Sequence, residues 1–276
     1  MKSRRIRQVV MYGLFFLGML ILALYWRFPA DIFREAAVLR VAEACPACSL
    51  SIQGMVLQFP SGLRLERTEL TFAGLGAAGV EADLIQIYPD PWKFFTGGMN
   101  LEMRMTGYGG RAWGASEFSG ILAPWASSVV MRFEDISVGK MSFLKPLLGE
   151  QTSGTLKGTF SYDRRRGSST GSGRVDFTVL DGAFPLQNSV PGINRLEFNR
   201  IDGQLVLAER SVKIEFINVN GQDVRCAMKG EVLIDPTDFG KSRLSVTGSM
   251  ELKALNYRKF PLSITGTLMN PVTKIG

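Results

Sequence analysis

From Leu50 almost to the end of the chain, apolar and polar residues alternate with a period of two. The clearest run is 99–106, where methionine and leucine alternate with asparagine, glutamate, arginine and threonine. Such alternation places one face of a strand in a core and the other in water, as is typical of antiparallel sheets. Turn residues interrupt the runs about every ten to fifteen residues, as hairpins require. The pattern predicts a mainly β domain over residues 50–276, with about fourteen strands.

A second pattern, in which a glycine is flanked by polar and then by apolar residues, recurs along this domain. It is centred on Gly158, Gly230, Gly248 and Gly266, and each glycine lies on the apolar side of the alternation. A missing side chain there permits a bulge, a sharp coil or the close approach of another backbone. We therefore predict one large, strongly curved, mostly antiparallel sheet, taco-like or an incomplete barrel. The stretch 164–174, rich in glycine and serine, is a candidate hinge between two β halves, and a single continuous sheet is the alternative.

The N-terminal part of the chain has a different pattern. Residues 9–26 carry no charge, and a helix of this length rises roughly 27 Å, close to the hydrocarbon thickness of a bilayer. Residues 1–8 are strongly basic, and such flanks stay in the cytoplasm. We predict a single transmembrane helix at 9–26 with a cytoplasmic tail before it. A cleaved signal peptide is the alternative, and the bulky sequence Trp26-Arg-Phe-Pro, a poor cleavage site, favours the retained anchor.

Residues 27–49 join this segment to the β domain and contain a predicted amphipathic helix. Asp31 is placed to cap the helix, and apolar residues recur at helical spacing up to Ala44. The helix would lie either on the membrane surface or across the end of the sheet. A second, short helix is predicted from Met141 to Leu148, in an apolar stretch that would plug the sheet.

Composition excludes several classes of function. The net charge is +7, but the basic N-terminal tail contributes much of it and the other charges are scattered, which argues against nucleic-acid binding. The chain has no histidine, which excludes the usual general base, histidine-activated nucleophiles and most catalytic zinc sites. We find no catalytic serine motif and no phosphate-binding loop. We therefore expect no enzymatic activity, no metal and no cofactor.

Two of the three cysteines, Cys45 and Cys48, form a C-P-A-C motif directly after the predicted amphipathic helix. In an oxidising compartment, residues at this spacing can reach disulfide distance, so a local disulfide is the favoured interpretation and free thiols are the first alternative. A redox role needs the motif at the start of a helix after a buried strand, and a zinc site needs further ligands. The third, Cys226, lies on the apolar side of its strand and is interpreted as a core residue.

Several stretches of the chain form a recognisable series. The predicted anchor leads through Phe-Pro into a helix, a Gly-Gly hairpin follows in the β domain, and a short helix precedes a strand that contains glycine. The stretches are 25–31, 50–53, 60–66, 105–114, 135–149, 153–158 and 264–271. Together they resemble type II secretion system protein N (GspN) and the wider AsmA-like group. The match extends over nearly the whole chain, although no invariant catalytic residue anchors it and the C-P-A-C motif is not a feature of the family.

The resemblance implies a single-pass inner-membrane protein of a diderm bacterium, with its N-terminus in the cytoplasm and its β domain in the periplasm. It would be a non-enzymatic accessory component of the type II secretion system, and its partners would be other subunits of that machine. AsmA-like relatives imply an alternative, a lipid-binding carrier or tether in outer-membrane maintenance.

The lipid alternative needs an apolar groove inside the curved sheet. Seven residues on the apolar side of the alternation are candidates to line it, and a closed core filled by side chains is the competing arrangement. The candidates are Met99, Leu101, Met103, Met105, Phe133, Phe160 and Phe177.

Overall fold

The structure is a computed structural model that describes residues 29–58, 62–74, 79–95, 98–118, 126–145, 149, 151–164, 171–190, 193–253 and 258–275, with scattered positions between 8 and 23. The described positions between 8 and 23 are helical, and the predicted transmembrane helix at 9–26 falls in part outside the described residues. Across the described part of the chain, no helix is both long and apolar enough to cross a membrane.

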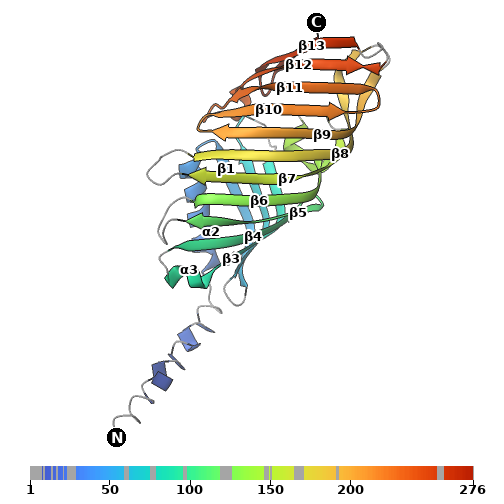
Figure 1. The fold of residues 1–276 in the computed structure, drawn as a ribbon. Helices are drawn as coiled ribbons and strands as arrows, with labels where there is room; N and C mark the ends of the chain where they lie inside the picture. The colour runs from blue at the N-terminus through green and yellow to red at the C-terminus, as the bar shows by residue number, and fades with distance from the viewer. Residues whose placement is uncertain are drawn as a thin grey trace.

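The described strands form one antiparallel sheet of fourteen strands whose spatial order is their order in the sequence. Figure 1 shows β4 to β13 as successive rungs, with β1 to β3 crossing behind them at a steep angle. The sheet is therefore strongly curved, and it stays open because β1 and β14 do not pair with each other. The strands are β1 (Cys48–Gln58), β2 (Gly62–Phe72), β3 (Gly79–Pro89), β4 (Met99–Gly107), β5 (Gly110–Phe118), β6 (Ala126–Ser137), β7 (Ser153–Arg164), β8 (Gly171–Val190), β9 (Ile193–Ala208), β10 (Ser211–Asn220), β11 (Val224–Leu233), β12 (Arg243–Leu252), β13 (Arg258–Thr267) and β14 (Pro271–Ile275).

The predictions of a mainly β chain and of one large, curved, open antiparallel sheet are confirmed. The sheet is continuous between β7 and β8, which pair from Ser153–Ala183 to Arg164–Gly171. The candidate hinge lies in their connection, where 165–170 are outside the described residues.

Helix α2 (Ala30–Ala44) begins one residue earlier than the sequence predicts, and Asp31 does not cap it. The carbonyl of Pro29 accepts hydrogen bonds from the backbone N–H groups of Ile32 and Phe33, so the first turn already includes Asp31. The carboxylate of Asp31 instead forms an ion pair with Arg34 at 2.7 Å. Its negative charge in the first turn also interacts favourably with the positive end of the helix dipole. The helix lies beside β1, and none of its residues is buried.

The predicted helix from Met141 to Leu148 is found only in part. Two 3₁₀ turns, η1 (Val138–Lys140) and η2 (Ser142–Leu144), precede Lys145, which is helical and whose carbonyl accepts a hydrogen bond of 2.8 Å from the N–H of Gly149. Residues 146–148 lie outside the described residues. Met141 between the turns has an extended backbone and a buried side chain, which interrupts helical hydrogen bonding. This segment does fill the concave side of the sheet, because Val138 packs in a buried cluster with residues of β8, β9 and β10.

Aromatic rings on the inner face lie over glycines of the neighbouring strand. Phe177 is opposite Gly203, and a Cβ at Gly203 would overlap its ring. In the same way, Phe133 is opposite Gly158, where a Cβ would lie 2.7 Å from the ring. A ring that covers a glycine restores apolar contact on a residue that has no side chain of its own. Of the four recurrent glycines, Gly158 thus seats an aromatic ring, whereas a Cβ at Gly230, Gly248 or Gly266 would meet mainly the backbone of a neighbouring segment.

Candidate functional site

The seven candidate groove residues all lie on the inner face of the sheet. Strand register connects them: Met103 pairs with Gly114, which pairs with Met131, which pairs with Phe160. Neighbouring rows place Met105 and Phe133 opposite Ala112, and Phe133 and Phe177 opposite Gly158. Met99 and Leu101 continue the inner face toward the start of β4 by alternation. The structure therefore brings together the residues that the sequence proposed.

Small residues on β5 separate the two apolar rows of this face. Opposite Met103 and Met105 stand Gly114 and Ala112, and the side chains of Met131 and Phe133 follow on β6. A Cβ at Gly114 would overlap the carbonyl of Val130, so β5 has no room for a larger residue there. The inner face therefore carries an apolar strip whose side chains are shorter along β5 than along β4 and β6.

This apolar strip is only half buried. Each of the seven candidates is partly exposed to solvent, in contrast to the buried clusters near η1. Those clusters centre on Phe198 and Val224, in β9 and β11. Phe177 also packs against the first of these clusters, whereas neither cluster includes the other six candidates.

The C-P-A-C motif forms a tight turn between α2 and β1. Cys45 and Cys48 are joined by a disulfide, with their Cα atoms 5.2 Å apart. The turn follows the C-terminal end of α2, so it lacks the helix N-terminus that lowers the pKa of a thiol in redox motifs. It buries Ala47, whose carbonyl accepts a hydrogen bond of 2.7 Å from the backbone N–H of Ala73. In the structure the motif holds a backbone contact between β1 and the end of β2.

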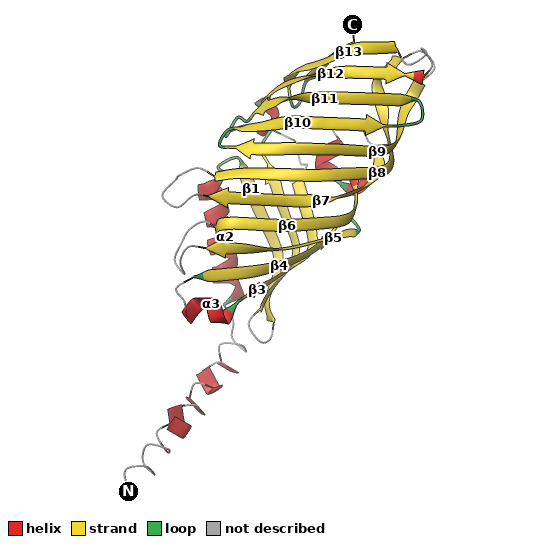
Figure 2. Ribbon diagram, in the orientation of Figure 1, coloured by secondary structure: helices red, strands yellow, loops and turns green. Residues whose placement is uncertain are grey.

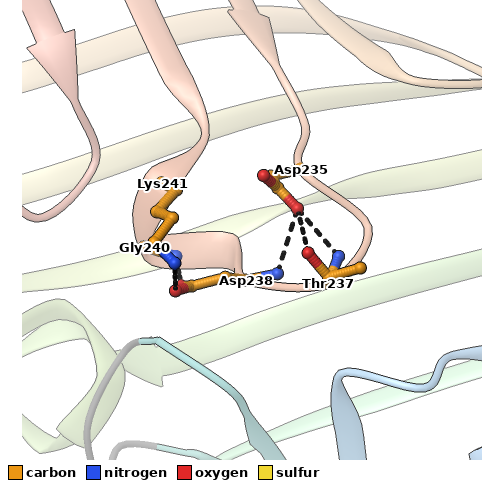
Figure 3. Close-up of polar contacts among 5 residues, drawn as sticks. All are labelled: Asp235, Thr237, Asp238, Gly240 and Lys241. Atoms are coloured by element: carbon orange, nitrogen blue, oxygen red, sulfur yellow. Dashed lines mark hydrogen bonds and ion pairs between the residues drawn. The ribbon is translucent and has the colours of Figure 1, made fainter.

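The connection between β11 and β12, residues 235–242, forms a compact turn that we call the clasp (Figure 3). One carboxylate oxygen of Asp235 accepts hydrogen bonds from the hydroxyl and N–H of Thr237 and from the N–H of Asp238. The hydroxyl of Thr237, followed by these backbone groups, holds the pKa of Asp235 below its usual value. Asp238 accepts from the N–H of Gly240 and forms an ion pair with Lys241 at 3.1 Å. These contacts fix the shape of the turn.

The clasp joins segments from both ends of the sheet. The N–H of Phe239 donates to the carbonyl of Ala73 at 3.1 Å, and the rings of Phe239 and Phe72 meet edge to face with centroids 5.4 Å apart. The carbonyls of Gly240 and Ser242 accept from the β13–β14 turn, and Ser242 is fully buried. These contacts tie the end of β2 to the last three strands and so hold the sheet in its curled shape. Sequence analysis missed this site, although the spacing of Asp, Pro, Thr and Gly at 235–240 is typical of a side-chain-capped turn.

The polar face carries a shallow recess of about 380 Å³ across β6 to β10. Its three carboxylates are already paired: Asp176 with Arg174 at 3.2 Å, Asp202 with Arg200 at 2.6 Å, and Glu134 with Arg111 at 3.3 Å. No group of His, Cys, Asp and Glu among the described residues could hold a metal ion. The recess therefore supplies no pair of carboxylates arranged for acid–base chemistry.

Cys226 lies on the inner face of β11, where it packs against both buried clusters. Burial raises the pKa of its thiol to about 11, so the thiolate is scarce at neutral pH. This environment agrees with the interpretation of Cys226 as a small core residue.

No family model, no curated protein and no solved structure matches the chain. The geometry of the sheet, its apolar strip and its clasp are therefore the observations that bear on function.

Proposed function

We propose that the protein is a membrane-anchored accessory component of a type II secretion system, and that its periplasmic β domain acts by binding and without catalysis. The resemblance of the sequence to GspN supports this, as does the helical, apolar character of the described positions between 8 and 23. The observation that carries the proposal is the open sheet, because an open antiparallel sheet offers backbone at its edges to a partner subunit.

The start of β13 is the edge best suited to such a partner. Strand β14 pairs only with 262–266, so Arg258 to Pro261 extend past its last described residue. A proline in a sheet directs its backbone nitrogen, which carries no hydrogen, toward the edge of the sheet. In a strand, the backbone N–H groups of residues two positions apart point to the same side. Pro261 pairs with Ser249 of β12, so the N–H of Lys259 faces the edge that the described part of β14 leaves uncovered.

We expect Lys259→Pro to weaken recovery of partner subunits by about five-fold, as the loss of one hydrogen bond of about 1 kcal/mol implies. Lys259→Ala is the matched control, because it also removes the ion pair with Glu251 but keeps the N–H. The measurement is quantitative pulldown of the tagged full chain after cross-linking in cells. Equal recovery with both variants would exclude this edge, and recovery of no secretion subunit, with exoprotein export intact in a deletion strain, would refute the proposed function.

A second candidate function, binding of a lipid acyl chain, is favoured by the half-buried apolar strip. Its methionines are adaptable side chains that accommodate varied apolar ligands. A lipid held there would contact Met103 on the inner face, whereas the neighbouring Glu102 faces water on the other side of the same strand.

Photoreactive benzoylphenylalanine placed at Met103 should therefore cross-link to phospholipid in cells, and the same group placed at Glu102 should not. The readout is the mass of the adduct after proteolysis of the full chain. A yield at least about ten-fold higher at Met103 is expected if the acyl chain lies on the inner face. Equal yields at the two positions would show adventitious lipid and would remove this candidate.

A further inference from the structure

The short helix α3 (Pro91–Phe95) displays the most exposed large apolar side chain among those described. The side chain of Trp92 is 78% exposed. The sequence of this helix, Pro-Trp-Lys-Phe-Phe, combines three aromatic residues and one lysine with no acidic residue. An exposed tryptophan beside a basic residue is typical of segments that lie at a membrane–water interface.

The backbone position of Trp92 is fixed by hydrogen bonds around the turn, one of them to a side-chain carboxylate. Asp90 accepts a hydrogen bond from the N–H of Trp92 at 3.0 Å, and its own N–H donates to the carbonyl of Asn100 at 2.9 Å. The N–H of Gly98 closes the other side by donating to the carbonyl of Lys93 at 3.1 Å. Because these bonds tie α3 to β4, Trp92 projects from a structured turn.

Helix α3 lies at the same end of the sheet as the start of α2, the helix that follows the N-terminal segment in the sequence. Figure 2 shows α3 at the lower end of the view, close to the lower end of α2. In the N-terminal segment the described residues Phe15 and Phe16 are 68% and 70% exposed. The first turn of α2 adds Ile32, which is 67% exposed. A bilayer would cover an apolar helix of this kind on all sides.

We propose that α3 is a second membrane contact, with Trp92 and Lys93 in the headgroup layer of the bilayer that the N-terminal segment enters. This inference rests on the membrane anchoring in the proposed function. The indole ring prefers the interfacial layer, and the lysine ammonium is attracted to the phosphates of anionic lipids. Strand β4 begins at Met99, shortly after α3, so the contact would bring the near end of the apolar strip close to the membrane surface.

The test is quenching of tryptophan fluorescence in the full chain, reconstituted in vesicles of phosphatidylethanolamine and phosphatidylglycerol. The emission of Trp92 is obtained as the difference between wild type and Trp92→Phe. Lipids brominated in the upper acyl chain should reduce this difference signal by about two-fold or more, because the interfacial layer is within contact range of the bromines. Trp113→Phe is the matched control: Trp113 lies on the polar face beside Arg111, and its difference signal should not respond to bromination.

Each other outcome overturns the inference in a distinct way. If the protein floats with the vesicles and the Trp92 signal is unquenched and red-shifted, α3 lies in water. If that signal is unquenched but blue-shifted, a protein surface or a second copy covers Trp92 instead of lipid. If the protein does not float with the vesicles at all, the membrane anchoring of the proposed function fails together with the contact at α3.

Discussion

Replacing Gly74 with alanine should lower the free energy of unfolding by about 3 kcal/mol, because the new side chain combines backbone strain with a clash in the clasp. Gly74 has φ of +86°, and a Cβ there would overlap the carboxylate of Asp238 and lie 2.7 Å from the backbone nitrogen of Gly240. The clash cannot be relieved by a rotamer change alone, since the nitrogen belongs to the clasp backbone. Urea denaturation of the full chain in detergent, followed by circular dichroism, measures the loss.

Gly109→Ala is the matched control for this prediction. Gly109 has a similar φ of +79°, but a Cβ there would meet only the flexible end of Lys140, at 3.1 Å. We expect this variant to lose about 1 kcal/mol, the cost of a left-handed alanine alone. Equal losses at the two glycines would mean that the clasp contact contributes nothing beyond local strain.

Replacing Gly203 with alanine should also destabilise the sheet by about 3 kcal/mol, because the new methyl group would occupy the position of the Phe177 ring. A Cβ at Gly203 would approach Cε1 of Phe177 to 2.5 Å, and the ring has β-sheet backbone beneath it. The Phe177 ring would have to move away from Gly203 and expose apolar surface to water. Thermal and urea denaturation of the single variant measure this effect.

A double-mutant cycle separates the ring contact from other costs. Phe177→Ala alone loses the contacts of the ring, and in that background Gly203→Ala should be nearly neutral because its methyl group then has room. The coupling energy should be about 2 kcal/mol, as for residues in direct contact. Losses that add without coupling would show that Gly203 is needed for some reason other than seating the ring.

The sheet could be predicted from the sequence because its signal is local. Alternation with a period of two identifies a strand without knowledge of its partners, and short turns between strands leave antiparallel neighbours as the simplest pairing. The same reasoning placed Met99 and Phe177 on one face although they lie on different strands. The apolar residues of each strand point to the face that is buried, and this face is the same for all strands of one sheet.

The clasp and the aromatic seats could not be predicted because they depend on distant partners. The contact between Ala73 and Phe239 follows from the curvature of the whole sheet, which no local window contains. The pairing of Phe177 with Gly203 depends on exact register, and a slip of one residue would send the ring to the other face. The start of α2 was misplaced for a different reason, because the carbonyl of Pro29 accepts the first helical hydrogen bonds. Met141 has an extended backbone where the sequence predicted the start of a helix, and helical structure begins only after it.

The strand order has a consequence for how this chain reaches its folded state. Each described strand pairs with its immediate neighbours in sequence, so every pairing closes a short loop and costs little chain entropy. A chain that emerges N-terminus first can therefore add hairpins one after another as they become available. The bond from Phe239 to Ala73 cannot form until most of the polypeptide has emerged, so nascent chains should first assemble as a growing ribbon and acquire their final curl in a late step.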